Sequence, residues 1–92
     1  QNVDIQLLLG FNDKNIRPIE DRFSSTLIIR GDRAIVKGIS NEVDNIEKII
    51  KEMIYVLNTT GRLDANDVIT IIDLTISGKE IISDDEYENI VL

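Results

Sequence analysis

The N-terminal part of this 92-residue chain carries two different hydrophobic periods. The odd-numbered residues from Val3 to Leu9 are all apolar, and this alternation predicts a half-buried strand that Gly10 ends. Over residues 16–23 the apolar positions are instead spaced by three and four, which predicts one stripe of a helix. Pro18 falls inside this helix and has no N–H to donate to the carbonyl of Lys14. With Asn15 as the helix cap, Pro18 lies in the first turn, so we expect a short helix.

A hairpin and two longer helices are predicted next. Thr26–Arg30 and Arg33–Lys37 are rich in β-branched residues, and Gly31-Asp32 between them suits a type II′ turn. The first long helix covers residues 41–57, with Ser40 or Asn41 as its cap and Gly61 just past its end. The second covers residues 64–76, starting at the capping residue Asp64. The residues predicted to form the buried face of the first helix include Ile46, Ile50, Met53 and Leu57.

The predicted order is strand, helix, strand, strand, helix, helix (β-α-β-β-α-α). This order gives an α+β fold with a small three-stranded sheet and helices packed on one face. Residues 1–78 are assigned to this domain. Residues 79–92 are expected to form an acidic linker followed by a strand, Tyr87–Leu92, that leads into another domain.

Composition argues against catalysis by these 92 residues. The chain contains no cysteine and no histidine, which excludes disulfides, thiolate metal sites and Ser-His or Cys-His pairs. Neighbouring carboxylates such as Glu20 and Asp21 point in different directions on a helix. The acidic run Asp84-Asp85-Glu86 lacks the shaped, glycine-containing loop of a hard-cation site. We therefore expect neither an enzyme nor a metal site in this part of the protein.

The net charge of −7 is unevenly distributed. Residues 1–39 contain six basic and five acidic side chains, a net charge of +1, so residues 40–92 carry −8. The half that contains Gly10 can therefore approach a polyanion although the whole chain is acidic. No stretch approaches the roughly 20 apolar residues of a membrane span, and no signal peptide is visible. We expect a cytoplasmic protein without a membrane partner.

Leu9-Gly10-Phe11-Asn12-Asp13-Lys14-Asn15-Ile16 is followed closely by Ile19-Glu20. This segment resembles the clamp loop of KH domains. That family uses a Gly-x-x-Gly loop between short helices to hold the backbone of four nucleotides of single-stranded RNA. Asp13 stands here in place of the second glycine, and Phe11 in place of the loop lysine. The positions that match the family pattern are Gly10, Lys14, Asn15, Ile16, Ile19 and Glu20. The resemblance implies a KH-like fold and an RNA-binding role.

The residues implied in nucleic-acid binding are Gly10, Lys14, Asn15 and Arg17. Binding is expected to be weak, because the carboxylate of Asp13 repels phosphate. A purely structural interpretation is also open: Gly10 ends a strand, Asn12 or Asn15 caps a helix, and Lys14 and Arg17 only solvate the surface.

Longer segments narrow the resemblance. LLLGFNDKNIRPIEDRF, IIRGD, VKG and TGRLDANDVITIID follow one another in an order that is similar to the N-terminal domain of PhoH-like proteins. In the last segment, Gly61, Leu63, Asp67 and Val68 fit the family signature. Pro18 and the pair Ser24-Ser25, where the family more often has a glycine, depart from the pattern.

PhoH-like proteins are phosphate starvation-inducible bacterial proteins with a C-terminal P-loop ATPase domain that is thought to act with RNA. The resemblance therefore implies a parent ATPase whose ATP and Mg²⁺ bind outside this fragment. No Gly-x-x-x-x-Gly-Lys-Ser/Thr motif occurs in the chain, so we expect no cofactor here. The implied partners are single-stranded RNA, the protein's own ATPase domain and other copies in a homo-oligomer.

The hairpin suggests a role of a different class. If Ala34 and Val36 face the core, the other side of the sheet is a mixed aliphatic and basic surface that suits docking to another domain or subunit. Its members are Ile28, Arg30, Arg33, Ile35 and Lys37. A docking or oligomerisation module that does not bind RNA is thus the alternative to the RNA-binding interpretation.

Overall fold

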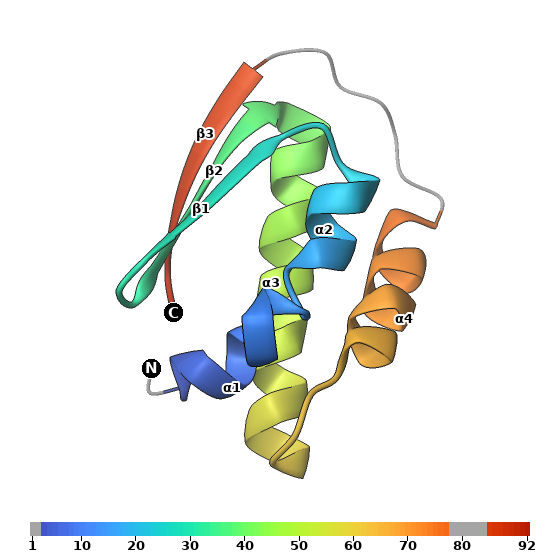
Figure 1. Ribbon diagram of the computed structural model, residues 1–92. Coiled ribbons are helices and arrows are strands. Elements are labelled where there is room, and N and C mark those ends of the chain that lie inside the picture. Colours follow the sequence, from blue (N-terminus) through green and yellow to red (C-terminus); the bar gives the residue numbers. More distant parts are fainter. Residues whose placement is uncertain (1–2, 78–84) are drawn as a thin grey trace.

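The structure, a computed structural model, describes residues 3–77 and 85–92. Helices cover one face of a small antiparallel sheet, which confirms the predicted α+β class (Figure 1). The elements in chain order are α1 (Ile5–Leu9), the single-turn 3-10 helix η1 (Phe11–Asp13), α2 (Arg17–Arg22), β1 (Thr26–Arg30), β2 (Arg33–Ile39), α3 (Ser40–Thr60), α4 (Ala65–Ile76) and β3 (Asp85–Val91).

The sheet has the order β1-β2-β3, and both pairs of strands are antiparallel. The predicted hairpin of β1 and β2 is confirmed, with Ile28 opposite Ile35 and Arg30 opposite Arg33. Gly31 has φ 57°, which is the positive value that a type II′ turn requires at its first central position. The long helix α3 crosses the sheet, and α2 and α4 lie beside it on the same face (Figure 1).

The core lies between α3, the inner face of the sheet and the two flanking helices. Ala34 and Val36 of β2 are fully buried, so the predicted inward face of the hairpin is confirmed. The predicted stripe of α3 is buried as well, through Ile46, Ile50, Met53 and Leu57, with Val43 and Ile49 beside them. Branched aliphatic side chains of this kind fill the space between strands and a helix efficiently.

The N-terminal strand predicted over residues 3–9 is wrong, because Ile5–Leu9 form the helix α1. The carboxylate of Asp4 accepts a hydrogen bond from the backbone N–H of Leu7 and caps the first turn. The run Leu7-Leu8-Leu9 also breaks a two-residue alternation. Leu8 is buried while Leu7 is 51% exposed, so one side of a single helical turn, not one face of a strand, meets the core.

The third strand of the sheet is β3, at the other end of the chain. Asp85–Val91 pair with β2 over its whole length, and Ile90 and Leu92 are buried in the core. A strand was expected near here, but as the lead into another domain rather than as part of this sheet. The acidic linker predicted from residue 79 begins outside the described residues, and the division of the chain at residue 78 stays a prediction.

Most of the predicted helix ends are confirmed, but two caps are not. Pro18 lies in the first turn of α2, although the residue at the cap is Ile16 and not Asn15. The long helix begins at Ser40 with Ile39 at the cap position, so neither Ser40 nor Asn41 caps it. The other predicted ends are as expected: Gly61 ends α3 in the left-handed region, and Asp64 forms a capping box with Asp67.

Glu42 in the first turn of α3 binds the link between α2 and β1. Its carboxylate accepts hydrogen bonds from the Ser25 hydroxyl at 2.6 Å and the Ser25 N–H at 3.0 Å, and from the Ser24 hydroxyl at 3.2 Å. Gly38 leaves room for this contact, because a Cβ there would lie only 2.7 Å from the Cβ of Ser25. The two serines that depart from the PhoH-like pattern therefore tie α2 and the hairpin to α3.

Candidate nucleic-acid interface

The segment from Gly10 to Ile16 joins α1 to α2, so the loop lies between two short helices. Gly10 has φ 78° and ψ 169°, a backbone conformation open essentially to glycine alone. A Cβ at Gly10 would come within 2.9 Å of Lys14 Cγ and of Asn15 Nδ2. Glycine is therefore required at this position for two independent reasons, backbone conformation and space.

The backbone also has positive φ at the two residues that precede Lys14. Asn12 has φ 55° and Asp13 has φ 59°, both in the left-handed region. Glycine adopts this region readily and asparagine and aspartate do so occasionally. For an L-residue the left-handed conformation costs roughly 1–2 kcal/mol. Asp13 thus occupies the position of the second family glycine and also has a conformation that glycine favours.

Asn15 positions the loop from the interior of the protein. Its side chain is completely buried, and Nδ2 donates to the carbonyls of Leu8 at 3.2 Å and Leu63 at 3.1 Å, with a longer contact to Leu7 at 3.4 Å. One amide thus joins the end of α1 to the segment that precedes α4. Asn15 cannot touch a nucleic acid from this position, so its predicted role as a binding residue is corrected to a positioning role.

Two exposed cations flank the loop. The Arg17 guanidinium donates to the carbonyl oxygen of Asn12 through Nε at 3.2 Å and Nη2 at 2.9 Å, which holds the positive charge against the loop backbone. Lys14 is exposed on the same segment, as is the carboxylate of Asp13. Two positive charges and one negative charge give the loop a local net charge of +1 in an otherwise acidic protein.

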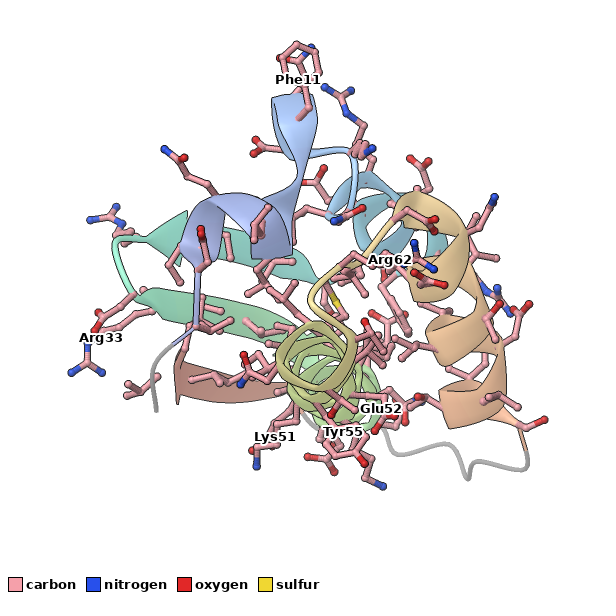
Figure 2. The ribbon with its side chains drawn as sticks, turned by 90° about the horizontal axis from the view of Figure 1, so that it is seen from below. Phe11, Arg33, Lys51, Glu52, Tyr55 and Arg62 are labelled. Carbon is pink, nitrogen blue, oxygen red and sulfur yellow. The ribbon has the colours of Figure 1, made fainter. Side chains whose placement is uncertain are left out.

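Phe11 is a surface feature that was not assigned a role from the sequence. Its side chain is 80% exposed and projects from the loop away from the body of the protein (Figure 2). A depression of about 400 Å³ lies beside it, lined by Gln6, Leu9, Gly10, Phe11 and Asp13. The signal that could have identified Phe11 was present in the sequence, since this is one of only four aromatic residues and it replaces a loop lysine.

The predicted outer face of the hairpin is present as a surface. Ile28 is 41% exposed and faces Ile35, which is half-buried, directly across the two strands. Arg30 and Arg33 form the next cross-strand pair, and Lys37 lies opposite Thr26 at the other end. Aliphatic and basic side chains therefore share one face of the sheet, as predicted.

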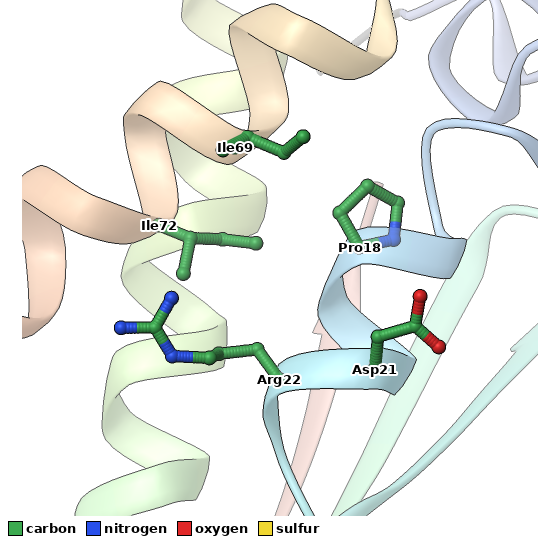
Figure 3. A pocket seen from close by; sticks show the side chains of 5 residues that line it. All are labelled: Pro18, Asp21, Arg22, Ile69 and Ile72. Atoms are coloured by element: carbon green, nitrogen blue, oxygen red, sulfur yellow. The ribbon is translucent and has the colours of Figure 1, made fainter.

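A second depression, of about 270 Å³, lies between α2 and α4 (Figure 3). Pro18, Asp21 and Arg22 line it from α2, and Ile69 and Ile72 from α4. Arg22 forms a salt bridge of 3.2 Å with Asp73, and both side chains are about half exposed. The depression combines apolar packing with an exposed ion pair and contains no arrangement suited to acid–base chemistry.

Comparison with known proteins adds no family to these observations. Neither the family models, nor the curated proteins, nor the solved structures contain a match to this chain. Within residues 3–77 and 85–92, no helix is long and apolar enough to cross a bilayer. The same residues contain no group of three or more side chains that could hold a metal ion.

Proposed function

We propose that this domain binds single-stranded nucleic acid, RNA in particular, through the loop from Gly10 to Arg17. The observation that carries the proposal is the backbone of the loop between α1 and α2. A KH-type clamp needs main-chain atoms that a sugar-phosphate can approach closely, on a tight turn between short helices. Gly10 and Asp13, the counterparts of the two family glycines, both have positive φ here.

The charges of the loop set the expected strength of binding. Lys14 and Arg17 attract phosphate, and Asp13 opposes it. The expected dissociation constant is that of non-specific contacts, about 10⁻⁴–10⁻⁶ M, and it rises with salt as counterions compete. The proposed ligand is therefore a short single strand held mainly by its backbone.

The wider role follows the resemblance to PhoH-like proteins and is part of the same proposal. The domain holds RNA for a P-loop ATPase of the bacterial cytoplasm whose ATP and Mg²⁺ sites lie outside these 92 residues. The fragment itself has a binding role and no catalytic role. The absence of histidine and cysteine from its sequence supports a role in binding rather than in catalysis.

Replacing residues of the loop tests the RNA-binding proposal. Asp13→Gly removes a like charge and the left-handed strain together, so it should strengthen binding of a short oligouridine. Lys14→Ala combined with Arg17→Ala should abolish binding and flatten its salt dependence. NMR titration of the fragment at low salt measures both effects, with amide shifts expected at Gly10–Arg17.

The control for this titration replaces two cations elsewhere. Lys48→Ala combined with Lys51→Ala removes the same amount of positive charge from α3. The loss of long-range attraction alone should leave RNA affinity within about twofold of the wild type. No amide shift at millimolar RNA, even in the Asp13→Gly variant, would contradict the RNA-binding proposal.

The outer face of the hairpin supports docking as a second candidate function. Ile28 and Ile35 form an aliphatic pair surrounded by Arg30, Arg33 and Lys37. Such a mixed patch fits an acidic, partly apolar surface on another domain or on a second copy. Residues 40–92 carry a net charge of −8, so each copy also has charge of the complementary sign.

If this face docks, the isolated fragment should self-associate weakly. Ile28→Glu should then abolish association, because it places a charge in the aliphatic pair. Sedimentation velocity over a concentration series measures the effect. Ile69→Glu on α4 is the matched control, since Ile69 is 46% exposed against 41% for Ile28. A wild-type fragment that stays monomeric at millimolar concentration would argue against docking between copies.

A further inference from the structure

The exposed ring of Phe11 has no packing role in this domain. Its exposed fraction of 80% is the highest among the large hydrophobic side chains of the described residues. A second exposed aromatic residue, Tyr55 on α3, lies on the opposite side of the molecule in Figure 2. Among the residues whose side chains the structure describes, Phe11 is therefore the one exposed aromatic group on the surface that carries the loop.

The surroundings of Phe11 distinguish between two kinds of ligand. A protein partner that used this ring as an anchor would require an apolar patch around it. The loop residues that follow it, Asn12, Asp13 and Lys14, are instead polar and exposed. An aromatic ring beside cations that attract phosphate is the arrangement that single-stranded nucleic-acid binders use, since each base offers a flat face for stacking.

The depression next to the ring has the groups that one base would meet. Leu9 and Gly10 line it with apolar side-chain and main-chain atoms, while Gln6 and Asp13 add polar groups. A carboxylate accepts hydrogen bonds and has no hydrogen to donate, so it pairs with the exocyclic amino group of cytosine and not with the carbonyl at the same position of uracil. The residue that opposes phosphate is thus able to recognise a base.

We propose that Phe11 stacks on one base of a bound single strand and that the depression beside it holds this base, with Asp13 accepting from its amino group. The inference rests on the proposed function and adds a base-binding subsite to the backbone clamp. The ligand class is single-stranded nucleic acid with cytosine, rather than uracil, at the position that reaches Phe11. Asp13 then weakens attraction for the backbone and supplies selectivity at the base.

Substitutions at Phe11 test stacking directly. Phe11→Ala should weaken binding of a short oligocytidine by about 5- to 150-fold, the usual range for loss of one stacked base. Phe11→Trp should retain binding. Because the chain has no other tryptophan, the fluorescence of this indole should be quenched when a base stacks on it. Tyr55→Ala is the matched aromatic control, and Tyr55→Trp the matched reporter. Neither should respond, because Tyr55 is 63% exposed on the far side.

The ligand is varied in the same assay. An oligomer of abasic nucleotides should bind to the wild type as weakly as oligocytidine binds to Phe11→Ala. Oligouridine should bind more weakly than oligocytidine to the wild type, and this difference should disappear in Asp13→Gly.

The outcomes separate the subsite from the clamp. One outcome is that oligocytidine binding shows the expected salt dependence and requires Lys14 and Arg17, while Phe11→Ala does not change the affinity. That outcome refutes the base-binding subsite and supports the backbone clamp. Phe11 would then be an anchor for a protein partner. Equal binding of cytidine and uridine oligomers refutes the role of Asp13. If neither oligomer binds to the wild type, the proposed function fails and the subsite fails with it.

Discussion

Ile50→Ala should lower the free energy of unfolding by about 2–4 kcal/mol, the usual cost of removing a buried isoleucine side chain down to Cβ. Ile50 lies in the middle of α3 and is 2% exposed, so the deleted atoms leave a cavity that few neighbours can fill. A domain of 92 residues has a total stability of only about 5–14 kcal/mol. The melting temperature, followed by far-UV circular dichroism, should fall by about 4–8 °C for each kcal/mol lost.

The matched control makes the same chemical change at an exposed position. Ile69→Ala on α4 removes the same atoms from a side chain that is 46% exposed, so it should cost far less than Ile50→Ala. Urea titrations of both variants give the two free energies on one scale. A cost at Ile50 within about 0.5 kcal/mol, as at a surface site, would place its side chain outside the core.

The long helices and the hairpin could be predicted from the sequence because each carries several consistent local signals. The helix α3 has an apolar stripe over its whole length and a glycine just past its end, and α4 has a capping box at Asp64. The hairpin has β-branched strands on either side of Gly31-Asp32. In each case pattern, cap and turn chemistry favour the same structure, which is the condition for local prediction to succeed.

The N-terminal element could not be predicted in the same way, because its two signals conflict. The apolar odd positions from Val3 to Leu9 favour a strand, whereas Asp4 as a cap and the run of three leucines favour a helix. A five-residue helix is marginal alone, so contact with the rest of the fold decides between them. Here Leu8 is buried in the core. The edge of β2 that does not pair with β1 pairs with β3, from the other end of the chain, so residues 3–9 cannot add a strand there.

The position of the loop could be predicted from the sequence, but the surroundings of its residues only in part, and their role in binding stays a prediction. The spacing from Gly10 to Arg17 identified the loop, and the structure brings Gly10, Lys14 and Arg17 together there. The sequence could not show that Asn15 points inward, because one of its two main partners is the carbonyl of Leu63, 48 residues away. Long-range hydrogen bonds of this kind leave no local pattern.

Asn15→Ala should lower the free energy of unfolding by about 2–4 kcal/mol and disturb the loop. The substitution removes the donor for the buried carbonyls of Leu8 and Leu63, and a buried group left without its partner costs about 1–3 kcal/mol. Gly10 lies beside this amide, so the left-handed backbone of the loop loses one of the contacts that hold it in place. Urea unfolding measures the stability, and amide shifts of residues 10–14 report the loop.

Asn58→Ala is the control for this last substitution, because Asn58 is exposed on α3 and its replacement should change stability by no more than about 0.5 kcal/mol. A positioning role and a ligand role for Asn15 predict different results. If Asn15 positions the loop, its loss lowers stability and shifts the loop amides before any RNA is added. A variant with wild-type stability and wild-type amide shifts that binds RNA more weakly would instead make Asn15 a direct contact, and would contradict its burial.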